Sequence, residues 1–250
     1  MGNAAEDLPL VTGRGLNACV FGASGGIGAA LVAELAARDD VGVVHAGSRK
    51  PGAASGKVLP FAFDLLDEAS VQRAAVAIGT PLDLVIVATG ALSFPGGTGP
   101  ERSVRAIDAA RMGELLAINT IGPALIAKHV LPLLPREGRS VFAALSARVG
   151  SIGDNRLGGW HSYRASKAAL NMLLRNFAIE LSRTHREAVV AALHPGTVDT
   201  ALSAPFQRRL REGQLQDAAA SAAALLTVID GLRPEDSGGF FAFDGKPIEF

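Results

Sequence analysis

Short apolar runs alternate along this chain with segments of helical spacing, and this alternation constrains the fold more than any other feature. The runs are apolar almost throughout, rather than at every second residue, which is typical of parallel strands buried on both faces of a sheet. Between them, positions such as Leu170, Leu174 and Leu181 mark one helix face. The sequence therefore predicts a doubly wound α/β fold, with helices on both faces of a mostly parallel, seven-stranded sheet. The expected strands are 16–22, 41–46, 58–63, 82–88, 140–145, 188–193 and 239–243.

The chain length favours one domain rather than several. A chain of 250 residues is long enough to bury most of its apolar surface in one core. Residues 1–14 are polar and contain glycine, so we expect a flexible lead-in followed by a single domain over 15–250. Two stretches rich in glycine and proline, 93–100 and 150–159, are expected to form loops at the rim of the sheet.

Charge and cysteine content exclude several classes of protein. Lys and Arg total 24, equal to Asp and Glu at 24, so no net field attracts nucleic acid or an anionic membrane. The N-terminus lacks the pattern of a secretory signal, and no stretch looks apolar and uniform enough to span a bilayer. We therefore expect a cytoplasmic protein without nucleic-acid or membrane partners. The single cysteine and the scattered histidines predict no metal site.

A glycine-rich turn links the first expected strand directly to a helical segment, 29–38. Glycines allow a tight turn and let backbone amides approach a pyrophosphate at the N-terminus of a helix. The strand before the turn and the helix after it favour this interpretation over an ordinary flexible turn. The residues expected to contact a dinucleotide here are Gly22, Ser24, Gly25, Gly26, Ile27 and Gly28.

The only tyrosine, Tyr163, precedes Lys167 by four residues, so the two side chains share one helix face. A neighbouring cation lowers the pKa of a phenol, which is about 10 when unperturbed. We therefore expect Tyr163 to exchange a proton near neutral pH. Any helix can carry such a pair, so its significance depends on the surrounding motifs.

Gly22, Gly26 and Gly28 have the spacing Gly-x-x-x-Gly-x-Gly rather than the Gly-x-Gly-x-x-Gly of the ordinary dinucleotide fingerprint. With this spacing the chain resembles the classical short-chain dehydrogenase/reductase family from residue 16 to 250. The strings 159–167 and 193–200 resemble its C-factor-like branch. The resemblance implies a Rossmann-fold catalytic domain that binds NAD(P), and assembly as a homodimer or homotetramer.

The resemblance also implies four catalytic residues: Asn119, Ser146, Tyr163 and Lys167. Tyr163 would exchange the proton, while Lys167 would lower the phenol pKa and bind the nicotinamide ribose. Ser146 would hold the substrate oxygen, and Asn119 would connect to the lysine through a water. Each residue also has a structural alternative: a strand cap for Ser146, a satisfied core amide for Asn119 and a surface pair for Tyr163 and Lys167.

Ser48-Arg49-Lys50 follows the second expected strand, where an acidic residue would bind the ribose of NAD. Because Arg can bind a 2′-phosphate with two hydrogen bonds, the sequence favours NADP over NAD. Alternatively, Arg49 and Lys50 only solubilise a loop. The family pattern Asn-Asn-Ala-Gly is replaced here by Val-Ala-Thr-Gly, which removes two asparagines. The remaining cofactor contacts implied by the resemblance are Asp64, Leu65, Ala88, Thr89, Gly90, Pro195, Gly196, Thr197 and Val198.

The substrate site is expected to include Ser146, Tyr163 and Trp160, although Trp160 alternatively anchors a loop on the core. The segment 201–215 carries Leu202, Phe206 and Leu210, which indicates a partly apolar small molecule. His194 receives no role.

The function predicted by these residues is an NADP-dependent oxidoreductase that interconverts a carbonyl and a secondary alcohol, with Tyr163 as general acid/base. A dinucleotide sensor with little turnover is the alternative, suggested by the C-factor resemblance and the altered Val-Ala-Thr-Gly turn. An epimerase or dehydratase also uses Tyr and Lys at this spacing, but 250 residues scarcely accommodate its usual substrate domain.

Overall fold

The computed structural model describes residues 14–79, 81–93, 99–209 and 213–250. Seven strands form one sheet in the order β3-β2-β1-β4-β5-β6-β9, and all neighbouring strands are parallel. This arrangement confirms the predicted doubly wound fold, and the strand ends differ from the expected ones by no more than two residues. The strands are β1 (Leu16–Phe21), β2 (Val41–Ser48), β3 (Val58–Ala62), β4 (Leu84–Val87), β5 (Ser140–Leu145), β6 (Ala188–His194) and β9 (Phe240–Ala242).

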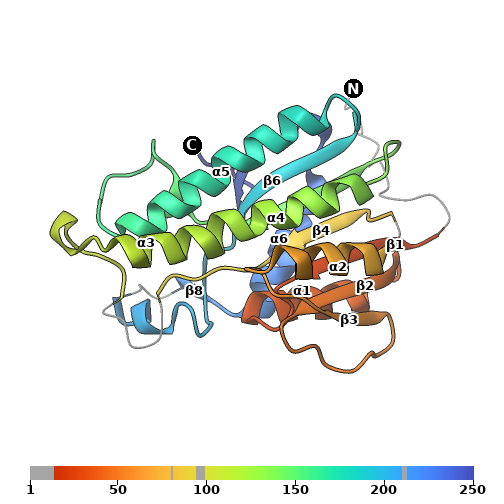
Figure 1. The fold of residues 1–250 in the computed structure, drawn as a ribbon, viewed down its shortest axis with the longest axis horizontal. Coiled ribbons are helices and arrows are strands. Elements are labelled where there is room, and N and C mark those ends of the chain that lie inside the picture. The colour runs from red at the N-terminus through yellow and green to blue at the C-terminus, as the bar shows by residue number, and fades with distance from the viewer. Residues whose placement is uncertain (1–13, 80, 94–98, 210–212) are drawn as a thin grey trace.

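Helices cover both faces of the sheet, and Figure 1 shows the long α5 running beside α3 and α4 across the front of it. Leu31 of α1 and Leu225 of α6 join one apolar cluster. Val71 of α2, Ile126 of α4 and Leu170 of α5 join the other. The six α-helices are α1 (Gly26–Ala37), α2 (Glu68–Ile78), α3 (Ala109–Leu116), α4 (Gly122–Val130), α5 (His161–Leu181) and α6 (Ala218–Gly231).

Alternate residues of the central strands point into the two clusters, so the strands are buried on both faces. In β1, Phe21 joins the cluster under α2, α4 and α5, whereas Val20 joins the one under α1 and α6. Val85 and Ile86 of β4 divide in the same way. Burial of one such side chain stabilises the fold by about 1.5–3 kcal/mol. This double burial explains why the strands are apolar throughout.

Residues 109–133 require one correction. They form a continuous helical segment of 25 residues, and an 18-residue window of it has a mean hydropathy of 1.3, which by length and composition is enough to cross a membrane. The expectation that no stretch meets these criteria is therefore wrong. Within the fold, 44% of that window is buried, and Ile126, Ala127 and Val130 of α4 pack into the core. Its apolar residues thus serve as the sheet-facing side of a core helix.

The order of strands places a crevice at the carboxyl ends of β1 and β4. The chain moves outward from β1 to β2 and β3, then returns to continue on the other side with β4, β5 and β6. In such folds, ligands bind where this reversal of strand order occurs. Predicted site residues lie at or directly after five of these strand ends: Ser48 is the last residue of β2, and Gly22, Ala88, Ser146 and Pro195 follow β1, β4, β5 and β6.

A second, two-stranded parallel sheet, which the sequence does not predict, lies after β6. It pairs β7 (Thr197–Val198) with β8 (Leu215–Gln216). Between them lies the short 3-10 helix η5 (Ala204–Arg209). The pairing of β7 with β8 holds the two ends of the segment 201–215 near each other. Leu210 of that segment lies outside the described residues.

Candidate active site

The glycine turn after β1 leaves no room for side chains at two positions. Gly22 has a φ of 93°, and a Cβ atom there would lie 3.0 Å from the backbone of Ala88 and Thr89. A Cβ atom on Gly28 would lie 2.1 Å from the carbonyl oxygen of Gly22. Glycine is therefore required for the backbone to close up in this way.

The N-terminus of α1 has no side-chain cap, whereas Asp67, Asp108 and Asp217 cap α2, α3 and α6. Its first amides and the positive end of its dipole therefore face the turn without a side-chain acceptor from the described residues. The turn residues Ser24, Gly25 and Gly26 are exposed, so a ligand can reach these amides. A tightly packed glycine turn, followed by a helix whose N-terminus has no side-chain cap, can bind the pyrophosphate of a dinucleotide.

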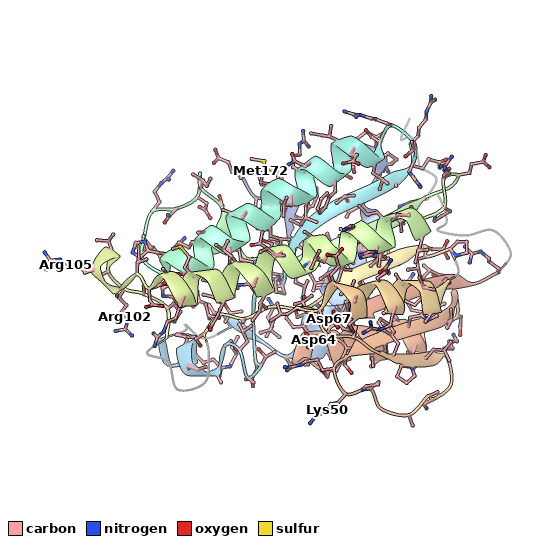
Figure 2. All side chains as sticks on the ribbon, in the orientation of Figure 1. Lys50, Asp64, Asp67, Arg102, Arg105 and Met172 are labelled. Atoms are coloured by element: carbon pink, nitrogen blue, oxygen red, sulfur yellow. The ribbon has the colours of Figure 1, made fainter. Side chains whose placement is uncertain are left out.

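The predicted adenosine contacts lie on the β2–β3 side of the crevice. Ser48 is buried at the end of β2, while Arg49 and Lys50 are exposed after it. Asp64 follows β3 and accepts a hydrogen bond from the amide of Leu66 at 3.0 Å. Leu65 packs against Gly122, where a Cβ atom would lie 2.4 Å from the leucine Cγ. Figure 2 shows Lys50 pointing outward at the lower edge, below Asp64.

Asn119 connects the end of β4 to α5. It lies in the π-helical turn η2 (Ala117–Ile121) between α3 and α4, rather than in the regular helix expected from the sequence. Such turns often occur at functional sites. Its Oδ1 accepts from the Ala91 amide at 2.8 Å, and its Nδ2 donates to the Ala91 carbonyl at 2.7 Å and to Ser166 Oγ at 3.0 Å. The amide is thus satisfied by protein groups, as the structural alternative proposed.

Gly90, a predicted cofactor contact, lies close to two of the predicted catalytic residues. A Cβ atom on Gly90 would lie 3.4 Å from Asn119 Oδ1 and 3.5 Å from Lys167 Nζ. Before it, Ala88 and Thr89 are partly buried, and the Thr89 hydroxyl has no hydrogen-bond partner among the described residues. This is the turn in which the two family asparagines are absent.

Tyr163 and Lys167 lie in the first turns of α5 and are both buried, so they are not a surface pair. Lys167 Nζ donates to the carbonyl oxygen of Leu145 at 2.8 Å. Burial lowers the pKa of Lys167 to about 8 and raises the pKa of Tyr163 to about 12. The expected lowering of the Tyr163 pKa is therefore wrong in this structure. Desolvation of the phenolate outweighs any benefit from the lysine, whose ammonium is directed at a carbonyl.

Ser146 directly follows β5 and has a partner that the sequence analysis did not identify. Its Oγ donates to Asn171 Oδ1 at 2.6 Å, and its amide donates to the carbonyl of Leu193 at 2.7 Å. Asn171 is buried, and its Nδ2 has no partner among the described residues. It follows Lys167 by four residues, so the shared helix face was an available signal.

Ser146 and Tyr163 line one cavity of about 730 Å³. Trp160 lines it too, and its ring centroid lies 6.3 Å from that of Tyr163 and 5.3 Å from that of Phe206. Trp160 faces the cavity and also packs against the buried cluster of Leu92, Leu115 and Tyr163, so the structure agrees with both alternatives. Its φ of 52° is the only positive value at a non-glycine residue in the described ranges.

The turn after β6 also lines the cavity, and it contains Pro195, Gly196, Thr197 and Val198, which the sequence predicts to contact the cofactor. His194 also lines the cavity, and its Nδ1 is buried without a described partner. Burial, and secondarily the positive charge of Arg148, lower the pKa of His194 to about 4. The imidazole is therefore neutral at physiological pH.

A match to the short chain dehydrogenase family spans residues 16–211. The chain belongs to this family. Over 201 residues this short-chain dehydrogenase is 35% identical to the 1-hydroxy-2-glutathionyl-2-methyl-3-butene dehydrogenase of Rhodococcus sp. (strain AD45), covering 79% of this chain and 83% of the relative. It is 36% identical over 142 residues to the C-signal protein of Myxococcus xanthus, covering 57% of this chain and 80% of that one.

A solved structure extends the likeness to the whole fold. The NADPH-bound carbonyl reductase from chicken fatty liver superposes with a TM-score of 0.81 at 25% identity, covering 97% of this chain and 98% of that one. These comparisons confirm the predicted family and the resemblance to its C-factor-like branch. The protein is an oxidoreductase of the NAD(P)-linked dehydrogenase/reductase type.

No group of three or more His, Cys, Asp or Glu side chains able to hold a metal ion occurs within the ranges that the structure describes.

Proposed function

We propose that this short-chain dehydrogenase interconverts a carbonyl and a secondary alcohol with NADP, and that Tyr163 is its general acid/base. The observation that carries the proposal is that Ser146 and Tyr163 face the same cavity as the 195–198 turn. The cavity lies at the carboxyl ends of the strands, beside the glycine turn. The similar carbonyl reductase, by its name, binds NADPH, which supports the same class of reaction here.

The bound nicotinamide would supply or accept the hydride. Ser146 would hold the substrate oxygen beside Tyr163, and the phenol would give its proton to that oxygen during reduction. With a pKa of about 12, Tyr163 keeps this proton at neutral pH, as an acid must. With a pKa of about 8, Lys167 is mostly protonated at pH 7, so its charge would stabilise the phenolate once the proton has left.

Asn119 contributes by holding the site together. Its three hydrogen bonds fix the backbone of Ala91 to Ser166, which lies between Tyr163 and Lys167 in sequence. Ser166 Oγ in turn donates to the carbonyl of Tyr163 at 2.8 Å. Such fixed geometry reduces the entropic cost of bringing reacting groups together.

The preference for NADP rests on the end of β2. Ser48 is buried there, Arg49 and Lys50 follow in exposed positions, and the acidic residue typical of NAD sites is absent from this run. A guanidinium at this position suits a 2′-phosphate, because Arg can donate two hydrogen bonds to it.

The dinucleotide-sensor alternative rests on the likeness to C-signal and on the altered turn at Ala88–Gly90. A pure sensor needs no proton donor in a substrate cavity. The placement of Ser146 and Tyr163 on one cavity, with Lys167 buried near them, therefore favours turnover.

The experiment that tests the proposal is a panel of ketones, aldehydes and secondary alcohols assayed with NADP(H) and NAD(H) in parallel. We expect carbonyl-dependent oxidation of NADPH, with a higher kcat/KM than with NADH. NADPH binding without turnover of any compound in the panel would favour the sensor instead.

A further inference from the structure

The substrate cavity is lined by three guanidinium groups and one carboxylate. Arg148, Arg156, Arg164 and Asp154 all come from the stretch between β5 and the first turn of α5. Asp154 and Arg156 lie in the loop 150–159, whereas Arg148 precedes this loop and Arg164 follows it in α5. Three arginines and one aspartate give this part of the cavity lining a net positive charge.

One of these arginines is neutralised by a carboxylate. Arg148 Nη1 lies 3.4 Å from Asp154 Oδ2. Arg156 Nη1 instead donates to the carbonyl of Gly153 at 2.7 Å. Among the described residues, no carboxylate lies within ion-pair distance of Arg156 or Arg164. Two positive charges along the cavity therefore have no carboxylate partner.

Arg164 is held rigidly where it lines the cavity. Its Nε donates to the carbonyl of Gly159 and its Nη1 to that of Val149, both at 3.0 Å. These two bonds fix the plane of the guanidinium before any ligand binds. They leave Nη2 without a hydrogen bond to any described residue. Burial lowers the pKa of Arg164, which shows that its charge is partly desolvated. A fixed, partly desolvated cation is a favourable partner for an anion, because little side-chain entropy is lost on binding.

The loop that carries Arg156 is also anchored. The amide of Gly153 donates to the carbonyl of Phe250 at 3.0 Å, and a Cβ atom on Gly153 would meet the side chain of Glu249 at 2.5 Å. Arg156 follows Gly153 by three residues, is exposed, and lines the cavity. The rest of the lining includes the apolar side chains of Leu92, Leu157, Trp160, Leu202 and Phe206.

From this arrangement we propose that the preferred substrate carries a carboxylate in addition to its carbonyl or alcohol group, and that Arg156 and Arg164 bind that carboxylate. The apolar lining takes the part of the molecule between the two groups. This inference rests on the proposed oxidoreductase function and specifies its substrate class. Arginine suits the task because its planar fork matches a carboxylate with two parallel hydrogen bonds.

The test compares substrates that differ only in charge. 4-Acetylbenzoate and methyl 4-acetylbenzoate share the reacting ketone, and S-(3-oxobutyl)glutathione and its dimethyl ester form a second pair. With NADPH, we expect kcat/KM to favour the anionic member of at least one pair by about tenfold at low salt, and by less at high salt because of screening. A preference in the first pair identifies simple carboxylates, and one confined to the second pair identifies peptide conjugates.

Variants of Arg156 connect that preference to the cavity. Arg156→Gln should reduce the ratio of anionic to neutral kcat/KM by about fivefold, and Arg156→Lys should reduce it by less, because the lysine keeps the charge but lacks the paired donors. Arg105→Gln is the matched control, because Arg105 is exposed at the far left end of the molecule in Figure 2 and does not line the cavity. Arg164 is left intact because its bonds hold the loop.

The outcomes separate the two proposals. If both members of each pair are reduced equally well, the anionic substrate is overturned, and if Arg156→Gln leaves the ratio unchanged, the carboxylate site proposed at Arg156 is overturned; in both cases the oxidoreductase function stands. If no carbonyl compound in the wider panel is reduced, the proposed function itself fails.

Discussion

Ser146 Oγ donates its hydrogen bond to Asn171 Oδ1 across 2.6 Å, at the base of the substrate cavity. A hydroxyl has one proton, so in this arrangement Ser146 cannot also donate to a substrate oxygen. Rotating the Asn171 amide by half a turn would present Nδ2, which has no described partner, to Ser146 Oγ. The serine proton would then be free to point into the cavity. Asn171 is thus placed to set the direction of the Ser146 hydroxyl.

The first prediction concerns this positioning residue. Asn171→Leu keeps a similar volume but removes both amide groups, so Ser146 loses the partner that directs it. We expect kcat for carbonyl reduction to fall about tenfold, while the Kd for NADPH changes less than about twofold, because the amide acts on the substrate side. Steady-state kinetics and a fluorescence titration measure the two quantities. Asn176→Leu, an exposed position on the same helix, is the control, and an unchanged kcat in Asn171→Leu would refute the role.

The second prediction concerns cofactor choice. If the Arg49 guanidinium binds the 2′-phosphate, Arg49→Ala should raise the Kd for NADPH by about tenfold and leave that for NADH nearly unchanged. Lys50→Ala, at the neighbouring exposed position, should have a smaller effect on NADPH because a lysine lacks the paired donors. Binding is measured by titration with both cofactors. Equal losses for NADPH and NADH in Arg49→Ala would contradict the assignment.

The third prediction concerns stability in acid. The pKa of His194 is about 4 in the folded protein, below its ordinary value of 6.5, so between these values the unfolded chain binds a proton that the folded one does not. Stability therefore falls as the pH drops below 6.5. At pH 5 this residue should account for a loss of about 1–2 kcal/mol.

His194→Gln removes the titrating group, so its free energy of unfolding should decline less between pH 7 and pH 5 than that of the unmodified protein. Urea unfolding at the two pH values measures both declines. The comparison isolates His194 because the carboxylates that titrate in acid are common to both proteins. Identical declines would show that His194 does not cause the loss.

Much of the fold could be predicted because its signals are local. The continuous apolar runs mark strands buried on both faces, and β5 has the bounds that its run predicts. Gly22, Gly26 and Gly28 lie within one short turn, so the sequence displays their spacing directly. By contrast, β7 and β8 are two residues each, and neither run is long enough to show a period.

The chemistry of the site was harder to predict because it depends on contacts between distant elements and on burial. Ser146 meets Asn171 only because β5 and α5 pack together, and Arg148, Arg156 and Arg164 line one cavity although they are not neighbours in the sequence. The pKa of Tyr163 was expected to fall because Lys167 is near in sequence. The sequence does not show that both side chains are buried, and burial is what raises that pKa.

The most direct test of the account is the rate of hydride transfer in Tyr163→Phe, measured in a single turnover with NADPH and a carbonyl substrate. The change removes the phenolic oxygen and keeps the ring beside Trp160, so the packing of the cavity is retained. The account predicts NADPH binding within about twofold of the unmodified protein and a transfer rate reduced at least about a hundredfold, the usual contribution of a general acid. A rate within a few fold of the unmodified protein would contradict it.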